Sequence, residues 1–308
     1  MSDQVYDVVI VGAGPAGLSA AIYAKRARLS CIVIEKTGGA GGQVLTTVDV
    51  DNYPGLPGIG GFELGQAFRE HCDKFDVRFV TDEVVGIGAE GDVKQVFGEE
   101  KTYECRTIIL ATGARHAKLK IPGENELAGR GVSYCATCDG AFFRKKTVAV
   151  VGGGDVAVED ALFLSRLCEK VYVIHRRNEL RAAKSLQEKL FEQPNVEMVW
   201  DTVVKEIKGE NNVTGLMVED VSVHSVKELK VDGVFIAVGI LPNSNEFTGK
   251  LAMNSSGYIV AGEDCVSSVP GIFAAGDVRD KQLRQVITAV ADGANAITSV
   301  QRYLNSVK

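Results

Sequence analysis

Two cysteines separated by two residues stand near the middle of the chain, in the segment SYCATCDG at residues 133–140. This spacing lets the sulfurs of Cys135 and Cys138 close a disulfide where the first turn of a helix begins, and a helix N-terminus favours the reactive thiolate. The same spacing occurs in zinc sites, which need two further ligands, and in inert structural positions. The chain has no second CxxC and its four histidines are scattered, so a redox-active pair is the favoured interpretation.

Asp139 directly follows the second cysteine. It could protonate a leaving thiolate as a general acid, or it could cap the turn that follows it. The sequence leaves both interpretations open. The five other cysteines are isolated along the chain, and we expect them to be buried or half-buried thiols. They are Cys31, Cys72, Cys105, Cys168 and Cys265.

Just after the cysteines begins the second copy of a pattern that also opens the chain. Residues 8–36 and 148–176 align without a gap after a shift of 140 positions. Each copy has a β-branched run, a glycine-rich turn, an apolar helical stretch and a second β-branched run, which is the βαβ unit of a dinucleotide-binding fold. One such pattern is a weak signal, because glycine-rich turns are common after strands. Two copies in matching context indicate that two nucleotides bind.

The glycines of each turn have separate physical tasks. Gly12 allows the tight turn from strand to helix, Gly14 lets the backbone approach a pyrophosphate, and Gly17 permits close packing of helix on strand. The helix N-terminus then presents N–H groups and a partial positive charge to the phosphates. The residues assigned to the two turns are Gly12, Gly14, Pro15, Ala16 and Gly17 in the first copy, and Gly152, Gly154, Asp155 and Ala157 in the second.

The end of the second strand in each copy indicates which ribose it meets. Glu35 of the first copy stands where a carboxylate accepts hydrogen bonds from ribose hydroxyls and repels a 2′-phosphate, so this site suits FAD or NAD. The equivalent residue of the second copy is His175, which is as compatible with a packing role as with a phosphate contact. A cationic cluster of Arg176, Arg177 and Arg181 follows it. Guanidinium groups bind phosphate well, so this site favours NADPH over NADH, with a solvated basic strand end as the alternative.

Two nucleotide sites and one CxxC together describe an electron relay. NADPH delivers a hydride, which carries two electrons, and a dithiol–disulfide couple also exchanges two electrons. A flavin can accept a hydride and then exchange electrons with sulfur, so it connects the two chemistries. The predicted order is NADPH to FAD, FAD to Cys135–Cys138, and that pair to an external disulfide.

Composition and charge restrict the class of protein. A chain of 308 residues is long enough for two domains, and its 45% hydrophobic and 24% charged residues are typical of a soluble globular protein. The net charge of −6 leaves no basic surplus for binding a nucleic acid. No apolar run reaches the roughly 18 residues that span a bilayer. The N-terminus has no signal-peptide pattern, so we expect a cytoplasmic protein.

Four segments carry a resemblance to a known family. They are CATCDG from residue 135, HRR from residue 175 with Arg181, GIFAAGDV from residue 271, and RQVITAVADGANA at 284–296. Together they resemble the low-molecular-weight, bacterial type of thioredoxin reductase, of the pyridine nucleotide-disulfide oxidoreductase family. The resemblance extends from residue 5 to about residue 303. One departure is Val156, where members often carry a small polar residue.

The resemblance implies an α/β fold with two Rossmann-like dinucleotide-binding domains, the NADPH domain being inserted into a discontinuous FAD domain. The FAD domain would comprise residues 1–116 and 246–308, and the NADPH domain residues 117–245, which include the CxxC pair. Thioredoxin would be the protein substrate of a homodimer that contains FAD and uses NADPH. Domain rotation about segments near 120–122 and 241–243 would present nicotinamide and dithiol to the flavin in turn.

The resemblance also assigns further residues to FAD. Asp277 would contact the ribityl chain, while Arg284 and its two neighbours would lie near the flavin ring. Beyond the first glycine turn and Glu35, the residues expected at FAD are Gly42, Gln43, Asn52, Thr112, Gly113, Gly276, Asp277, Arg284, Gln285 and Val286.

Three other functions are compatible with these residues. The same relay could serve another protein disulfide carrier, such as that of a peroxide-reducing system, although such flavoproteins generally carry an added N-terminal thioredoxin-like region. The chain could be a flavin-based redox sensor with the CxxC as its switch, although a sensor does not need two complete nucleotide modules. It could also be an NADPH oxidase or quinone reductase whose cysteines take no part.

Overall fold

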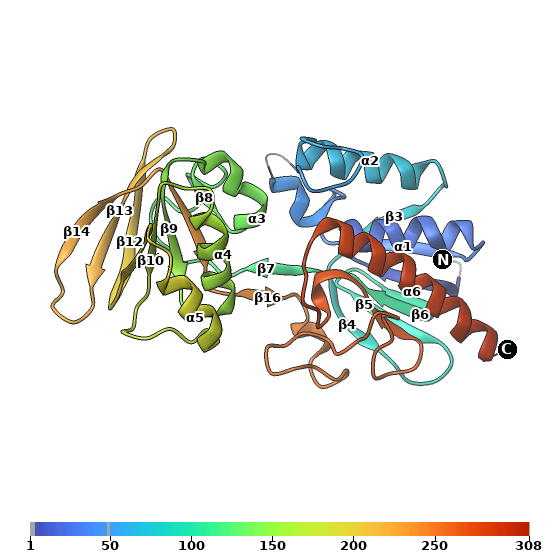
Figure 1. Cartoon of the computed structure of the whole chain (residues 1–308). Coiled ribbons are helices and arrows are strands. Elements are labelled where there is room, and N and C mark those ends of the chain that lie inside the picture. The colour runs from blue at the N-terminus through green and yellow to red at the C-terminus, as the bar shows by residue number, and fades with distance from the viewer. Residues whose placement is uncertain (1–3, 48–49, 308) are drawn as a thin grey trace. The chain divides into compact units, whose positions relative to one another are not determined.

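The chain forms two compact units. The computed structural model describes residues 4–47 and 50–307. Unit 1 is Met1–Arg115 with Leu241–Lys308, and unit 2 is His116–Ile240. Unit 2 is therefore an insertion in unit 1, which Figure 1 shows by the blue and red ends of the chain lying in the same unit. The sequence led us to expect divisions after residues 116 and 245; the units divide after Arg115 and Ile240.

Unit 1 is built on a sheet with the strand order β3-β2-β1-β6-β5-β4, and β17 also pairs with β6. Strands β1, β2, β3, β6 and β17 are parallel, whereas β5 and β4 run antiparallel to their neighbours. The strands are β1 (Tyr6–Val11), β2 (Cys31–Glu35), β3 (Arg78–Thr81), β4 (Val84–Gly88), β5 (Lys94–Gly98), β6 (Thr102–Leu110) and β17 (Ile272–Ala274).

Helices α1 (Pro15–Arg26) and α6 (Val286–Ser306) pack against each other in unit 1 (Figure 1). A Cβ atom on Gly293 of α6 would lie 2.2 Å from the carbonyl oxygen of Ala16 in α1, so this close approach requires glycine. The packing places Gly293 of α6 beside Ala16, a residue of the first glycine turn. The remaining helical segments of unit 1 are η1 (Gly42–Thr46), α2 (Gly61–Asp73), η3 (Asn245–Phe247) and η4 (Gly276–Val278).

Unit 2 contains a parallel sheet with the order β11-β10-β9-β15-β8 and an antiparallel sheet β12-β13-β14. A two-stranded sheet of β7 and β16 is formed by the segments at which the chain passes between the units. These strands are β7 (Ala114–His116), β8 (Val132–Ser133), β9 (Thr147–Gly152), β10 (Lys170–Ile174), β11 (Val196–Val199), β12 (Thr202–Gly209), β13 (Val213–Asp220), β14 (Val226–Lys230), β15 (Gly233–Ala237) and β16 (Ile240–Pro242). The helical segments are α3 (Ala136–Asp139), η2 (Gly140–Phe143), α4 (Asp155–Ser165) and α5 (Lys184–Phe191).

The two copies of the sequence repeat adopt the same structure. In unit 1 they form β1-α1-β2, with Val8 paired to Cys31, and in unit 2 they form β9-α4-β10, with Val148 paired to Val171. These pairs differ by the same 140 positions as the sequences, so even the register is repeated. The predicted α/β class with two dinucleotide-binding folds is confirmed. Within the described part of the chain, none of the helices is long and apolar enough to cross a membrane.

Candidate functional site

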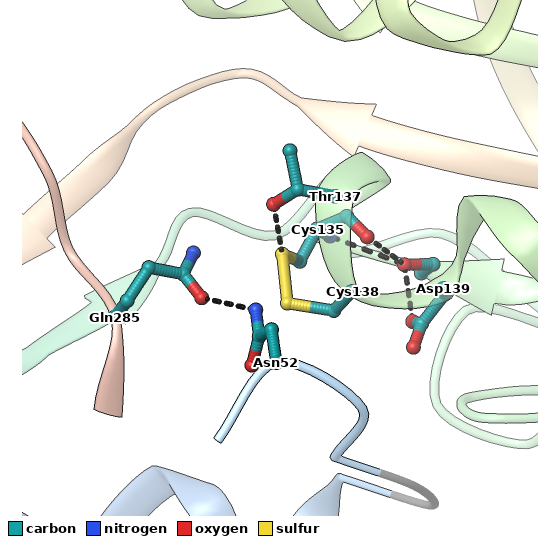
Figure 2. Close-up of a disulfide and its surroundings, with 7 residues drawn as sticks. Asn52, Cys135, Thr137, Cys138, Asp139 and Gln285 are labelled. Atoms are coloured by element: carbon teal, nitrogen blue, oxygen red, sulfur yellow. Dashed lines mark hydrogen bonds between the residues drawn. A yellow bond between two sulfur atoms is a disulfide. The ribbon is translucent and has the colours of Figure 1, made fainter. Parts of the chain in front are cut away.

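Cys135 and Cys138 are bonded to each other in a disulfide, with their Cα atoms 5.3 Å apart (Figure 2). Cys135 is the extended N-cap residue of α3, and Cys138 lies within that short helix. The turn expected from the two-residue spacer therefore exists and holds both sulfurs within bonding reach. Both residues are half-buried. The Sγ atom of Cys135 also lies 3.4 Å from the hydroxyl of Thr137.

The five other cysteines are buried and unbonded to one another, which confirms the interpretation of them as packing thiols. Burial raises the pKa of Cys31 and Cys168 to about 11, and that of Cys72 to about 12. Burial likewise raises the pKa of Cys105 and Cys265 to about 12. Because the thiolate is the nucleophile in sulfur exchange, these thiols are poorly suited to react near neutral pH. Partial exposure distinguishes the Cys135–Cys138 pair from all of them.

Asp139 is held beside the disulfide by a serine that the sequence did not single out. The hydroxyl of Ser133, a buried residue of β8, donates to Oδ2 of Asp139 at 2.6 Å, and the backbone N–H of Cys135 donates to that hydroxyl at 3.1 Å. Figure 2 shows these bonds around Asp139. Among the described residues, the Asp139 side chain makes no capping bond to the turn η2 that follows it. The arrangement thus orients this carboxyl group toward the segment of the cysteines.

A second network joins the residue before Cys135 to the start of unit 2. The hydroxyl of Tyr134 donates to Glu124 at 2.8 Å, and this fully buried carboxylate also accepts from the backbone N–H groups of Leu119 and Lys120 at 3.0 and 2.6 Å. The Tyr134 ring stacks on His116, with ring centroids 5.3 Å apart. Burial, reinforced by Glu124, raises the pKa of Tyr134. The segment around residue 120, where we expected a hinge, is thus hydrogen-bonded within unit 2.

The first glycine turn has the shape of a nucleotide cradle. Gly12 has φ of +103°, and a Cβ there would lie 2.5 Å from the carbonyl oxygen of Ala111. A Cβ on Gly17 would lie 1.9 Å from the carbonyl oxygen of Gly12. At Gly14, by contrast, no described atom lies within 4 Å of the Cβ position. Gly12 and Gly17 are therefore required by packing, and Gly14 leaves open space where the backbone can meet a ligand.

The other residues of this turn fit the same purpose. Pro15 is the first residue of α1, and Ala16 is buried against Gly276, whose Cβ would lie 2.9 Å from that of Ala16. Glu35 accepts a hydrogen bond from the backbone N–H of Ala13 at 2.7 Å, so its carboxylate is oriented by the turn itself. Gly42, with φ of +62°, approaches the turn from η1: its Cβ would lie 3.1 Å from the Cα of Gly14.

Two side chains of unit 1 carry buried polar atoms that point to a missing partner. The Oδ1 atom of Asp277 and the Nε atom of Arg284 are buried and have no hydrogen-bond partner among the described residues. Burial raises the pKa of Asp277, and the Arg284 guanidinium lies 4.1 Å from the centroid of the Tyr258 ring. Buried polar groups are almost always hydrogen-bonded. These two atoms therefore fit a polar ligand such as FAD, to which both residues were assigned.

The remaining residues assigned to FAD are held by bonds within unit 1. Gln43 donates to the carbonyl oxygen of Ala114, and Asn52 donates to Gln285 at 2.9 Å (Figure 2). Gln285 is also the N-cap of α6, in a capping box with Thr288, and Val286 is the first residue of that helix. Thr112 donates to the carbonyl oxygen of Asn243 at 2.6 Å. Its neighbour Gly113 has φ of +69°.

A buried ion cluster that the sequence did not indicate supports the turn before Asp277. Asp292 of α6 accepts from the backbone N–H of Gly276 at 2.9 Å, from both sides of the Arg279 guanidinium at 2.8 Å, and from Lys281 at 2.9 Å. Desolvation opposes ionisation of Asp292, but the bonds to Arg279 and Lys281 outweigh it, so its pKa is lowered. The carboxylate thus holds Gly276, with φ of +79°, in a conformation that favours glycine.

The second glycine turn repeats the division between packing and open positions. A Cβ on Gly152 would lie 2.4 Å from the carbonyl oxygen of Ala237 and 2.7 Å from the Cβ of Ala157. Around the Cβ position of Gly154, no atom of residues 4–47 or 50–307 lies within 4 Å. Val156, the departure noted in the sequence, is about half exposed. It therefore leaves the packing of the turn undisturbed.

His175 and the three arginines have different environments. His175 is only 5% exposed, and its ring occupies the space beside Gly153, whose Cβ would lie 2.2 Å from it. Burial, with the nearby Arg181, lowers the pKa of His175, so the ring is neutral at neutral pH and does not supply a charge for a phosphate. The three arginines that follow in this segment, Arg176, Arg177 and Arg181, are exposed.

Comparison with known proteins places the chain in a family. Residues 6–293 match the model of the family described as pyridine nucleotide-disulphide oxidoreductase. The thioredoxin reductase of Bacillus subtilis is 45% identical over 307 residues, which is 99% of this chain and 97% of that protein. The crystal structure of thioredoxin reductase from Streptococcus pyogenes has a TM-score of 0.94 at 46% identity, covering 99% of this chain and 100% of that one. The chain belongs to the pyridine nucleotide-disulphide oxidoreductase family.

Proposed function

We propose that this chain is an NADPH-dependent flavoenzyme that reduces the disulfide of thioredoxin. The observation that carries the proposal is the half-buried Cys135–Cys138 disulfide, placed at the start of α3 in the same unit as the second glycine turn. Relatives of nearly the same length that are named thioredoxin reductase support the choice of acceptor. FAD, when bound, accepts two electrons from NADPH and passes them to a disulfide.

Unit 1 would hold FAD. The open space at Gly14 and the N-terminus of α1 would receive the pyrophosphate, and Glu35 would accept hydrogen bonds from the ribose hydroxyls. The buried Oδ1 of Asp277 would accept a bond from a ribityl hydroxyl, and the buried Nε of Arg284 would donate to the flavin. The other residues assigned to FAD would complete this site from η1, the end of β6 and the start of α6.

Unit 2 would hold NADPH. The space at Gly154 and the start of α4 would receive the pyrophosphate, and Arg176, Arg177 and Arg181 would bind the 2′-phosphate. His175 is buried and neutral and packs against Gly153, and its buried Nε2, which has no hydrogen-bond partner among the described residues, would be available to the coenzyme. Asp155 accepts a bond from the backbone of Ala183, so its contribution to this site is made through the loop that carries the arginines.

Once reduced, the cysteine pair would pass its electrons to thioredoxin by thiol–disulfide exchange. One thiolate attacks a sulfur of the thioredoxin disulfide and forms a mixed disulfide, and the other then closes the Cys135–Cys138 bond. Thioredoxin leaves as a dithiol, so the two electrons and two protons of the reduced pair pass to one disulfide. Asp139, oriented by Ser133, would give a proton to the departing thiolate.

Asp139→Asn is expected to lower the rate of thioredoxin reduction by roughly a hundredfold, the lower end of the range for removing a general acid. An amide keeps the hydrogen bond from Ser133 but cannot supply the proton. Flavin content and the rate at which NADPH bleaches the flavin should stay within about twofold of the parent protein. Stopped-flow absorbance at the flavin band measures the reduction of the flavin by NADPH, and a steady-state assay measures the reduction of thioredoxin. An unchanged steady-state rate would leave Asp139 without a catalytic role.

Arg177→Ala is expected to raise the KM for NADPH by roughly ten- to a hundredfold, the cost of losing a hydrogen bond to a charged group. The KM for NADH should hardly change, since NADH has no 2′-phosphate. Arg166→Ala, which removes another exposed arginine of unit 2 outside the cluster, is the matched control and should change neither value. Equal increases in KM for both coenzymes would contradict the assignment of Arg177 to the 2′-phosphate.

We also infer that the chain works as a homodimer in the cytoplasm, an inference that rests on the family resemblance. Light scattering on the purified protein measures the dimer directly, and a monomer that turns over at full rate would contradict it.

The experiment that tests the proposed function is the oxidation of NADPH by the purified protein, with and without oxidised thioredoxin and with NADH as the comparison. Oxidation that requires thioredoxin and prefers NADPH is the expected result. Oxidation that is independent of thioredoxin would leave the nucleotide sites in place and exclude this acceptor.

A further inference from the structure

We infer that Asp155 determines the preference for NADPH without touching the coenzyme, by holding the arginine-bearing loop against the glycine turn. The inference deepens the proposed function, because it rests on the assignment of the 2′-phosphate to Arg176, Arg177 and Arg181. In the sequence, Asp155 was counted among the residues of the turn itself. The structure gives its side chain a different partner.

The partner of Asp155 is the far end of the arginine loop. Asp155 is the first residue of α4, and its Oδ1 accepts a hydrogen bond of 2.7 Å from the backbone N–H of Ala183. Ala183 in turn is the N-cap residue of α5, in an extended conformation with φ of −55°. The carboxylate therefore lies where two helices begin, and both helix N-termini favour a negative charge there. Asp155 and Ala183 are both exposed, and their bond connects the turn to the loop at the surface of unit 2.

Three further contacts show that the loop is fixed at both ends. At its beginning, the His175 ring fills the space beside Gly153. Near its end, the backbone N–H of Arg181 donates to the carbonyl oxygen of Gly153 at 2.7 Å. Gln187 of α5 donates to the carbonyl oxygen of Ala182 at 2.7 Å. The loop thus packs and hydrogen-bonds against the glycine turn. Among the described residues, Asp155 makes the one side-chain hydrogen bond from the turn to the loop.

Burial alternates along the end of the loop in a way that exposes Arg181. Leu180 and Ala182 are 7% and 6% exposed, whereas Arg181 between them is exposed. With its backbone bonded to Gly153 and its neighbours buried, Arg181 has little freedom in where its side chain begins. If the bond from Asp155 to Ala183 were lost, the end of the loop would keep the bonds at Arg181 and Ala182 but lose its attachment at Ala183, and the cation cluster would be less preorganised.

Electrostatics argue against a direct contact between Asp155 and the 2′-phosphate. A carboxylate repels a phosphate, and one oxygen of Asp155 already serves Ala183. A residue that acts through the loop should therefore affect only coenzymes that carry a 2′-phosphate. A residue that touched the shared part of the coenzyme would affect NADPH and NADH equally.

The test compares Asp155→Ala with Asp155→Asn in the FAD-containing enzyme. Asp155→Ala should raise the KM for NADPH by about tenfold, the value of one net hydrogen bond, and leave kcat at saturating NADPH and the KM for NADH within about twofold. Asp155→Asn retains an acceptor oxygen for Ala183 and should behave like the parent protein. Calorimetry supplies a readout without turnover: Asp155→Ala should weaken binding of 2′,5′-ADP about tenfold and leave binding of 5′-AMP unchanged.

Ala183→Pro removes the same bond from the other side. Proline has no backbone N–H, and its fixed φ near −65° matches that of Ala183. The variant should reproduce the selectivity loss of Asp155→Ala, and the double variant should lose no more than either single one. It also tests the bond if Asp155→Ala does not fold.

Three results would overturn the inference: equal loss of 2′,5′-ADP and 5′-AMP binding, no loss of either, or an Asp155→Asn variant as impaired as Asp155→Ala. If the parent protein itself bound 2′,5′-ADP no better than 5′-AMP, the proposed NADPH site would be wrong, and the Asp155 inference would fall with it.

Discussion

Cys138→Ser is expected to abolish NADPH-driven reduction of thioredoxin, by at least about a thousandfold, the scale of loss seen when an enzyme loses its nucleophile. Cys135→Ser should have the same effect, because serine cannot form or exchange a disulfide at either position. The structure explains why no other thiol can substitute: the five remaining cysteines are buried, and burial raises the pKa of each thiol to about 11 or about 12. Both variants should retain FAD and should still be reduced by NADPH.

Cys168→Ala is the matched control for these variants. Cys168 lies in the same unit as the pair but is only 6% exposed, so its removal should leave turnover within about twofold of the parent protein. Thiol titration under denaturing conditions gives a second readout, since NADPH should add two titratable thiols to the parent protein and to Cys168→Ala, and none to Cys138→Ser. Undiminished thioredoxin reduction by Cys138→Ser would refute the relay.

The features that could be predicted from the sequence are those that depend on local backbone geometry. Gly12 and Gly17 are required because a Cβ at either would collide with a neighbouring carbonyl oxygen. Such requirements impose a fixed spacing on the sequence, and 140 positions later the pattern recurs with Gly152 and with Ala157 in place of Gly17. The two βαβ units and the disulfide turn were recognisable for this reason.

The residues that support the site could not be predicted, because their types are common and only the folded chain decides which of many possible partners each one meets. Glu124 is one of many glutamates, and only the folded chain brings the backbone of Leu119 and the hydroxyl of Tyr134 to it. Asp292 likewise reaches Gly276 across 16 positions through the packing of α6. Ser133 offered a weak signal, since it stands two residues before Cys135, but a serine at that distance has many possible partners.

Asp155 and His175 show a different limit. Asp155 stands at a position where the nucleotide motif led us to expect contact with the coenzyme, and at His175 the sequence left packing and phosphate contact equally open. In the structure Asp155 accepts a bond from the backbone N–H of Ala183, and the His175 ring packs beside Gly153 with its buried Nε2 unpaired among the described residues. A motif thus identifies the positions that matter to a site. It does not distinguish a side chain that touches the ligand from a side chain that positions another residue.

Two matched glycine variants should reveal which unit binds which nucleotide. Gly14→Val should yield a folded protein without FAD, and Gly154→Val should yield a yellow protein that binds NADPH on the order of a hundredfold more weakly, the upper cost of overfilling a packed space. Both glycines have extended backbones, with φ of −77° and −97°, so valine causes no conformational strain. No described atom lies within 4 Å of either Cβ position, so the Cβ of the new side chain meets no atom of the described chain.

Gly17→Val is the control for these two variants. Its Cβ would lie 1.9 Å from the carbonyl oxygen of Gly12, so the fold itself should fail, which circular dichroism would detect. Gly14→Val and Gly154→Val should instead keep the far-ultraviolet spectrum of the parent protein and differ only in flavin absorbance and in coenzyme titration. If Gly154→Val lost FAD and Gly14→Val kept it, the two nucleotides would have to exchange units. If Gly14→Val and Gly154→Val each retained FAD and bound NADPH normally, the pyrophosphates would not lie in the open space at these turns.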